Sequence, residues 1–375
     1  MKKELRAPTF FIVAGEASGD LHGSQLMIEL KKINSNINFV GHGGDKMISA
    51  GLRVIEHINK MSVMGFSEII KHLPFLFGVM GKTLNKLEKL KPDRIILIDY
   101  PGFNLRLAKN CSGLSIPITY FILPQLWAWK EKRIQVFQKY VDQSLSIFPF
   151  EQNWFEKRGV PTNYVGHPFT ENITPELTKK EFYLKHNIKT EKRIITLLPG
   201  SRQQEVDLLW PVFYESAKKI KEKEDVEIVV GKFSGIQLPE KKNVIIEKDD
   251  IYAAMSYAQA AITASGTAAL ECAVMDTPEV VCYKLSSISA FIAKRVNKAP
   301  FVSMVNLIVN RKIVTEFLQN EVSVDNIVEE VTPLLSNTNK RKNMLLGFDE
   351  MRRSLGLPGV YKRAAESIMK KTSFG

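Results

Sequence analysis

An aspartate stands at the end of a strongly apolar run in the sequence RIILIDYPGFNLRLA, residues 94–108. The run predicts a buried parallel strand, so Asp99 follows the carboxyl end of that strand, where α/β sheets bind their ligands. A carboxylate at this position can act as a general base on a hydroxyl nucleophile. The same pattern also fits an acid that only caps the turn into the next helix.

Two further acids follow the first predicted strand, in the sequence FFIVAGEASGD, residues 10–20. Glu16 and Asp20 flank Ser18 at the same end of the sheet as Asp99, and the glycines do not complete a dinucleotide-binding pattern. These two acids can assist Asp99, bind an amine or hydroxyl of an acceptor molecule, or cap the next helix. The sequence leaves the three roles open.

Two strand-to-helix turns in the second half of the chain have the character of anion sites. LPGSR brings Gly200, Ser201 and Arg202 to one turn, and TASGTAALE brings Ser265, Gly266 and Thr267 to the other. Small residues there expose the unpaired N–H groups of a helix N-terminus, and an arginine adds a fork that matches phosphate oxygens. Glu271, one turn into its helix, can accept hydrogen bonds from ribose hydroxyls. The pair of turns favours a nucleoside diphosphate, with simple helix capping by Ser265 and Thr267 as the alternative.

Several other chemistries lack their sequence patterns. The chain has no P-loop and no D-x-D pair, and GHGG at 41–44 is only a partial dinucleotide pattern. Its six histidines show no close metal-ligand spacing, so we expect no metal and no cofactor. The three cysteines form no C-x-x-C and fit a reducing cytoplasm.

The elements that carry these turns alternate between short apolar strands and amphipathic helices, which predicts an α/β protein with parallel sheets. We predict eleven strands, and their approximate ranges are 9–14, 38–41, 94–98, 118–123, 144–148, 163–165, 193–198, 227–230, 244–247, 260–263 and 280–283. A polar stretch over 166–193 divides them into two doubly wound, Rossmann-like domains with the ligand site expected in the cleft between them. We expect the domains to cover residues 1–168 and 169–345, and helices over 346–375 to pack back on the first domain.

The segment 61–91 carries more apolar residues than one core-facing helix stripe needs. The chain as a whole has a net charge of +12, which favours anionic partners. Together these features predict contact with an anionic membrane surface, while burial in the core or a homodimer contact would use the same residues. The residues expected to touch lipid are Val63, Met64, Phe66, Ile69, Ile70, Leu73, Phe75, Leu76 and Phe77. No stretch is long enough to span a bilayer, and no recognisable nucleic-acid motif is present.

Ten short motifs occur in an order that resembles the lipid-A-disaccharide synthase family across about residues 9 to 360. They are AGEASGD, GGDKM, SVMGFSEI, IDYPGFN, PQLWAWK, FPFE, GHPF, LPGSR, TASGTAALE and NRKIVTEFLQ. The resemblance implies a two-domain glycosyltransferase of the GT-B fold. Such an enzyme joins UDP-2,3-diacylglucosamine to 2,3-diacylglucosamine 1-phosphate with inversion, giving a β-1,6-linked disaccharide phosphate and UDP in lipid A biosynthesis.

The resemblance also implies roles for individual residues. Asp99 would deprotonate the acceptor hydroxyl, with Glu16 as a second catalytic candidate, and Arg202 would stabilise the departing UDP. The nucleotide would contact Gly200, Ser201, Ser265, Gly266, Thr267, Glu271, Asn306, Glu316 and Gln319, and the acceptor would contact Glu16, Ser18, Asp20 and Asn104. The expected location is the cytoplasmic face of the inner membrane, without a metal. The alternative is another UDP-GlcNAc-using GT-B enzyme, a peptidoglycan-type transferase or a 2-epimerase.

Overall fold

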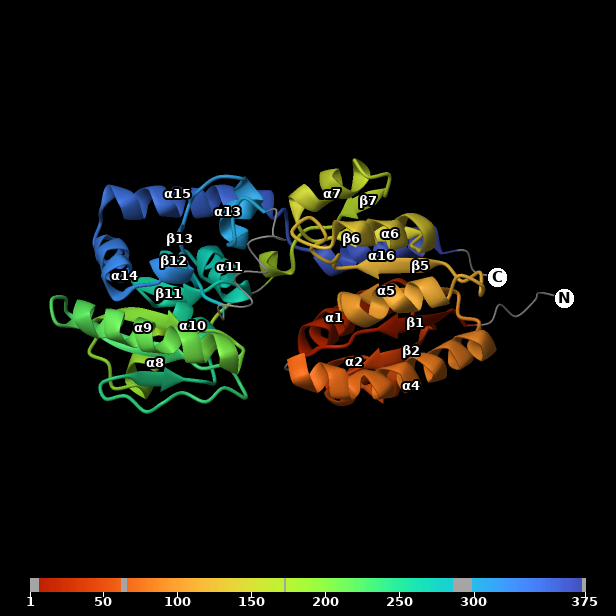
Figure 1. The fold of residues 1–375 in the computed structure, drawn as a ribbon, viewed down its shortest axis with the longest axis horizontal. Helices are drawn as coiled ribbons and strands as arrows, with labels where there is room; N and C mark the ends of the chain where they lie inside the picture. The colour runs from red at the N-terminus through yellow and green to blue at the C-terminus, as the bar shows by residue number, and fades with distance from the viewer. Residues whose placement is uncertain (1–6, 62–65, 172, 286–298, 373–375) are drawn as a thin grey trace. The chain divides into compact units, whose positions relative to one another are not determined.

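The computed structural model describes residues 7–61, 66–171, 173–285 and 299–372, and the chain divides into two compact units. Unit 1 comprises Met1–Pro168 and Leu357–Gly375, and unit 2 comprises Phe169–Gly356. Each unit is a parallel sheet with helices packed against it (Figure 1). The prediction of two doubly wound α/β domains is therefore confirmed.

The sheet of unit 1 has seven strands in the order β3-β2-β1-β4-β5-β6-β7, and every neighbouring pair is parallel. The strands are β1 Thr9–Val13, β2 Asn38–Gly43, β3 Leu52–His57, β4 Arg94–Ile98, β5 Ile118–Phe121, β6 Gln143–Ser146 and β7 Thr162–Tyr164. The helices are α1 Ala17–Ile33, α2 Asp45–Ser49, α3 Ile58–Met61, α4 Phe66–Leu90, α5 Pro101–Asn110, α6 Ile134–Tyr140, α7 Pro149–Glu156 and α16 Val360–Lys371.

The alternation of side chains along β1 builds a core on each face of this sheet. Phe10 and Ile12 join a buried cluster with residues of α1 and α16, and Phe11 and Val13 join a second cluster with residues of α4, α5 and α6. Because both faces are covered, the central strands are apolar throughout, which is why their sequence runs were recognisable.

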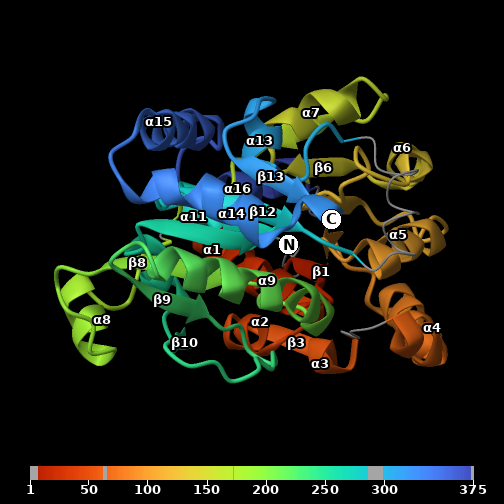
Figure 2. The same ribbon diagram turned by 60° about the vertical axis from the view of Figure 1, so that its left-hand side comes forward.

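The sheet of unit 2 has six parallel strands in the order β10-β9-β8-β11-β12-β13, and β8 to β10 can be followed in Figure 2. The strands are β8 Arg193–Leu198, β9 Val226–Gly231, β10 Ile245–Glu247, β11 Ala260–Ala264, β12 Glu279–Tyr283 and β13 Thr315–Leu318. The helices are α8 Lys179–Lys185, α9 Gln203–Lys221, α10 Ile251–Ser256, α11 Thr267–Val274, α13 Met304–Val309, α14 Val324–Val331 and α15 Asn339–Ser354.

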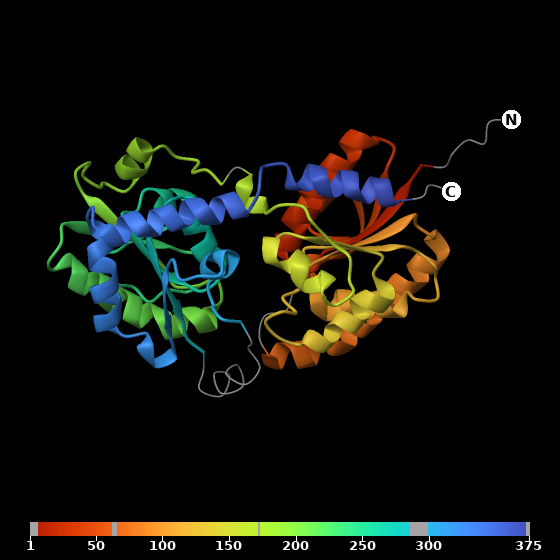
Figure 3. The same cartoon turned by 90° about the horizontal axis from the view of Figure 1, so that it is seen from above.

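The end of the chain departs from the expected boundary at residue 345. That position falls inside α15, which contacts α13 and α11 of unit 2, and the chain returns to unit 1 only at Leu357. The blue helix α16 then lies along the red helix α1 (Figure 3). Buried Arg94 donates to Thr372 Oγ1 at 2.8 Å, and Gln143 Nε2 donates to Ser367 Oγ at 2.9 Å, so side chains of two strands hold this last helix.

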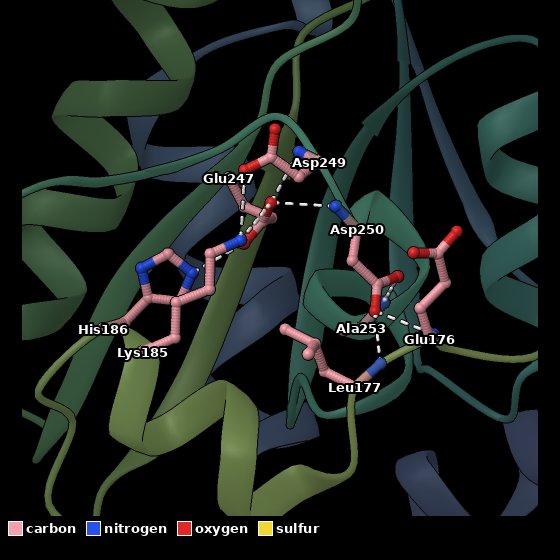
Figure 4. A network of polar contacts seen from close by, with 8 residues as sticks. All are labelled: Glu176, Leu177, Lys185, His186, Glu247, Asp249, Asp250 and Ala253. Atoms are coloured by element: carbon pink, nitrogen blue, oxygen red, sulfur yellow. Dashed lines mark hydrogen bonds and ion pairs between the residues drawn. The ribbon is translucent and has the colours of Figure 1, made fainter.

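A polar network ties β10 to α8 within unit 2 (Figure 4). The buried carboxylate of Glu247 accepts hydrogen bonds from Lys185 Nζ at 2.9 Å, His186 Nε2 at 2.6 Å and the backbone N–H of Asp250 at 2.9 Å. Burial raises the pKa of Glu247, but these donors outweigh burial and lower it to about 2. The network has every feature of a structural ion cluster, because its donors leave the carboxylate no free oxygen.

Candidate functional site

The strand order places a topological switch point in each sheet. In unit 1 it lies between β1 and β4, and in unit 2 between β8 and β11, since consecutive strands run outward from those pairs in opposite directions. Ligands of open α/β sheets bind beyond the carboxyl ends of the strands at such points. Glu16 and Asp99 follow β1 and β4, whereas Arg202 and Ser265 follow β8 and β11. These four residues thus follow the strands that border the two switch points.

The backbone at Asp99 is strained and firmly held. Asp99 and Tyr100 have φ values of 44° and 47°, in the left-handed region that costs free energy for residues other than glycine. The Asp99 carbonyl accepts hydrogen bonds from Tyr120 Oη at 2.6 Å and Asn104 Nδ2 at 2.7 Å. The Asp99 N–H donates to Phe121 O at 3.1 Å. This clamp fixes the direction in which the carboxylate leaves the chain.

The electrostatic surroundings make Asp99 a stronger base than an ordinary carboxylate. Burial and the negative charge of Glu16 raise its pKa to about 6, against a smaller opposing effect of the Tyr100 N–H. A carboxylate with a pKa this close to neutrality is mostly ionised at pH 7 and accepts a proton more readily than a solvated one.

Tyr100 explains the glycine before Glu16. A Cβ on Gly15 would lie 2.2 Å from Cδ1 of Tyr100, so only glycine leaves room for that ring. Tyr100 Oη donates to Met61 O at 2.9 Å, which fixes the ring against the turn. Glu16 and Ser18 remain exposed at the start of α1, and the Glu16 side chain makes no capping bond to the described part of that helix.

The carboxylate of Asp20, in α1, is hydrogen-bonded to the backbone of α2. Its two oxygens accept the N–H groups of Gly44 at 2.7 Å, Lys46 at 3.1 Å and Met47 at 3.0 Å at the start of α2. In the structure Asp20 therefore caps α2. Asn104 is likewise buried, and its Nδ2 donates to the Asp99 carbonyl, whereas its Oδ1 has no hydrogen-bond partner among the described residues.

In unit 2 the turn after β8 leaves a cation free to meet a ligand. Gly200 has φ +127°, a conformation that favours glycine, and its Cβ would lie 2.7 Å from Oε2 of Glu205. Arg202 is the N-cap residue of α9, and 75% of its side-chain surface is exposed. Its Nη1 lies 3.6 Å from Oε1 of Glu205. Ser201 is exposed beside it. The α9 N-terminus and Arg202 therefore present donors to solvent on the same turn.

The turn after β11 presents a second helix N-terminus. Gly266 and Thr267 are exposed, and Ser265 Oγ donates to Val302 O at 3.3 Å, which leaves α11 without a side-chain cap among the described residues. Glu271 is buried and accepts a hydrogen bond from Tyr252 Oη at 3.1 Å. Burial raises its pKa to about 7, against the effect of that bond. A second hydrogen-bond partner from a ligand would favour its ionised form.

Three residues expected to contact the nucleotide make hydrogen bonds to Leu285 and within the segment 302–316. Glu316 accepts from the N–H groups of Val302 at 2.9 Å and Ser303 at 3.0 Å, and from Asn306 Nδ2 at 2.8 Å. The Asn306 amide also pairs with backbone groups of the 313–314 segment, which fully occupies it. The Gln319 amide pairs with both backbone groups of Leu285, each at 3.2 Å.

Two buried residues near Asp99 escaped the sequence analysis as site residues. In the sequence, Tyr120 looks like one more apolar position of strand β5, and Glu151 looks like an ordinary acid in the first turn of α7. Glu151 has no exposed surface, accepts a hydrogen bond from Trp127 Nε1 at 3.2 Å, and has no partner for Oε2 among the described residues. Glu151 ends FPFE, one of the ten motifs of the family resemblance, but nothing in that motif indicates that the acid is buried.

The apolar segment is only partly described. Val63 and Met64 lie outside the described residues, as do the side chains of Phe66, Ile69 and Ile70. Of the rest, Leu73, Phe75 and Leu76 are half-buried, and Phe77 is 63% exposed. Phe75 packs against the core of unit 1, so at least part of the segment is buried there. Among the helices that the structure describes, none has the length and apolarity that crossing a bilayer requires.

Comparison with known proteins connects this arrangement to one enzyme family. A family profile described as lipid-A-disaccharide synthetase matches residues 10–370. The chain is 37% identical to the lipid-A-disaccharide synthase of Acidobacterium capsulatum, over 98% of each chain. It is 34% identical to that of Myxococcus xanthus, over 97% of each chain.

Solved structures share the two-unit fold at low sequence identity. A UDP-GlcNAc 2-epimerase from Neisseria meningitidis bound to UDP-GlcNAc matches with a TM-score of 0.68 and 13% identity, over 97% of this chain and 100% of that one. The calicheamicin glycosyltransferase CalG4 matches with a TM-score of 0.60 and 13% identity, over 98% and 99%. These likenesses identify the GT-B fold, and the full-length sequence matches show that the chain belongs to the lipid-A-disaccharide synthase family.

Proposed function

We propose that this chain transfers a diacylglucosamine unit from UDP-2,3-diacylglucosamine to 2,3-diacylglucosamine 1-phosphate, with inversion, in lipid A biosynthesis. The observation that carries the proposal is the full-length match to relatives named lipid-A-disaccharide synthase. It is supported by the complementary chemistry of the two switch points, a raised-pKa carboxyl in unit 1 and an exposed arginine in unit 2.

In the proposed reaction Asp99 removes the proton of the acceptor 6-hydroxyl as that oxygen attacks the anomeric carbon of the donor. The bond from the anomeric carbon to the phosphate oxygen breaks, and UDP leaves with the electron pair. Attack opposite the leaving group gives the β-1,6 linkage. The proton on Asp99 then passes to solvent, which restores the base for the next cycle.

The leaving diphosphate gains negative charge that donors of unit 2 would stabilise. We assign this role to Arg202 with the turn residues Gly200 and Ser201, and to Ser265, Gly266 and Thr267 at the start of α11. Positioned donors of this kind lower the barrier because they need no reorganisation as charge develops. Glu271 would hold the ribose hydroxyls. Asn306, Glu316 and Gln319 would contact the nucleotide or order the segment 302–316 beside it.

On the acceptor side we assign Glu16 and Ser18, the exposed residues next to Asp99. Glu16 also acts on catalysis through its charge, since it contributes to the raised pKa of Asp99. Asp20 and Asn104 are assigned to the backbone contacts described above.

We further propose peripheral association with the anionic cytoplasmic face of the inner membrane, since both substrates carry acyl chains and the chain carries a net charge of +12. Replacing Phe75, Leu76 and Phe77 together with serine should weaken sedimentation with anionic vesicles more than it lowers the melting temperature. The single change Phe77→Ser separates the exposed ring from the half-buried neighbours. A larger loss of stability than of vesicle binding would assign the segment to the core.

The deciding experiment incubates the purified chain with both acylated sugars and follows the products by mass spectrometry. We expect UDP and a tetraacyl disaccharide phosphate, with no product when either acyl sugar is replaced by its deacylated form. The fold shared with UDP-GlcNAc 2-epimerases makes epimerisation the second candidate. Conversion of UDP-GlcNAc alone to its C2 epimer, without acyl dependence, would establish that alternative and refute the transfer reaction.

A further inference from the structure

Unit 1 contains a third carboxyl group close to its catalytic edge. Strands β4, β5 and β6 are parallel neighbours, with Ile98 paired to Phe121 and Phe121 to Leu145, so the segments that follow them leave the sheet side by side. Asp99 follows the first of these strands, and Glu151 lies in the helix that follows the third. The two carboxyl groups are close enough for the charge of Asp99 to raise the pKa of Glu151.

Glu151 is enclosed on all sides in the described structure. It has no exposed surface. Trp127 Nε1 donates a hydrogen bond to Oε1 at 3.2 Å, and the backbone N–H groups of Phe148 and Ile147 also face the carboxyl group. Oε2 is buried without a partner among the described residues. The rings of Phe150 and Trp127 meet edge to face at 5.1 Å, and the ring of Phe148 stacks on Phe150 at 5.8 Å. Three partly exposed aromatic rings thus pack on one another beside the helix turn that carries the buried acid.

An ionised carboxylate in this place would be costly. A charge removed from water needs a counter-charge or a full set of donors, and otherwise the group stays neutral. The charged and titratable groups that face Glu151 from other elements are Asp99 and, on β7, Tyr164, whose own neighbour Arg363 lies on α16. Burial raises the pKa of Glu151 to about 8, although Trp127 and the backbone N–H groups of Phe148 and Ile147 lower it.

We propose that Glu151 is a positioning residue that works as a neutral carboxylic acid. It holds the indole of Trp127 over the carboxyl edge of unit 1 without adding a third negative charge beside Glu16 and Asp99. When Glu151 ionises, the few donors around it do not replace the water that a charged carboxylate needs, so the carboxylate turns toward water and releases Trp127. The inference deepens the proposed transfer reaction and rests on it, because the kinetic tests measure the rate of that transfer.

The first test is the pH profile of kcat/KM for Glu151→Gln, whose amide keeps the size of the acid and still accepts from Trp127. At pH 7 we expect activity within about threefold of wild type, since an amide replaces a group that is already neutral. The kcat/KM of the wild type should fall as the pH rises through about 8, which gives its pH profile an alkaline limb. The profile of Glu151→Gln should have no such limb. Glu156→Gln, an exposed carboxyl on the same helix, is the matched control and should keep the wild-type profile.

The second variant is Trp127→Phe, which keeps an aromatic ring and removes the indole donor. Because this variant has no indole for Glu151 to hold or release, its kcat/KM should be lower than that of wild type at pH 7 and should not fall further as the pH rises through about 8. This variant keeps the inference testable if Glu151→Gln does not fold.

Two results would overturn the inference: a loss of more than about a hundredfold at pH 7 in folded Glu151→Gln, or an alkaline limb that neither variant moves. An infrared difference spectrum of wild type against Glu151→Gln reports protonation without any turnover. A protonated carboxyl band at pH 7 that is absent from the variant supports the neutral acid, and its absence from wild type refutes it. If the chain proved not to catalyse the transfer, the infrared result would still stand by itself.

Discussion

The carboxyl edges of the two sheets hold their chemical groups in opposite ways. At the edge of unit 1, Asp99 lies on a strained turn, buried tyrosine and asparagine side chains hold its carbonyl, and its pKa is raised to about 6. At the edge of unit 2, the Arg202 side chain is largely exposed and forms an ion pair with Glu205. A base has to be desolvated and aimed before the reaction, whereas a cation can order itself on an anionic ligand when that ligand arrives.

If this contrast is functional, removing the base should have the largest effect. Asp99→Asn keeps the shape of the side chain and removes its ability to take a proton, so we expect kcat to fall by about 10²–10⁴-fold. Stopped assays with mass spectrometry give kcat, and thermal unfolding shows whether the fold is kept. Asp45→Asn, an exposed acid on α2, is the control. Wild-type turnover by Asp99→Asn would transfer the role of base to Glu16.

Removing the cation of unit 2 should cost less than removing the base. For Arg202→Ala we expect a fall of about 10²–10³ in kcat, the size found for a lost donor to developing charge. Calorimetry should show weaker UDP binding, because the exposed guanidinium is free to meet phosphate. Lys218→Ala, exposed further along α9, controls for the change in net charge. Unchanged UDP affinity together with unchanged kcat would remove Arg202 from the site.

The clamp around Asp99 should make a smaller, more specific contribution. Tyr120→Phe deletes the 2.6 Å hydrogen bond to the Asp99 carbonyl and keeps the ring in the core. We expect kcat to fall by about tenfold, the worth of one buried hydrogen bond, with KM unchanged. Tyr140→Phe, on α6 against the same core cluster, is the matched control. A fall in melting temperature without a fall in kcat would make the hydroxyl a purely structural group.

The smallest effect should be a shift in pH dependence from Glu16→Gln. The acid limb of kcat/KM should report the Asp99 pKa of about 6, because activity requires the ionised base. Glu16 raises that pKa by its negative charge, so the variant's acid limb should move to lower pH, by less than about one unit. A limb that stays in place would mean that burial alone sets the basicity of Asp99.

Most of the fold could be predicted from the sequence, but few of the side-chain contacts could. The eleven predicted strands are all present, and the central strands among them are apolar because both of their faces are buried. The two strands that were not predicted, β3 and β13, lie at sheet edges and carry exposed or half-buried polar residues such as Arg53 and Glu316.

The roles of single polar residues were harder to predict, because their partners lie far away along the chain. The capping role of Asp20 could not be predicted, because the sequence does not show that backbone N–H groups within residues 44–47 donate to its carboxylate. Asn306 and Glu316 lie ten residues apart, and only the folded loop shows that they bond each other. Asp99 and Arg202 were accessible to prediction because a strand's end alone fixes which edge of the sheet they occupy.

The passage of α16 back to unit 1 makes unit 2 an insertion within a discontinuous domain. Unit 2 is continuous in sequence and contains all of its own elements, whereas unit 1 is completed only by the last helix. Without α16 the buried face of α1 and the guanidinium of Arg94 lack their cover. A chain that ended at Gly356 would therefore contain one finished domain and one with an exposed core.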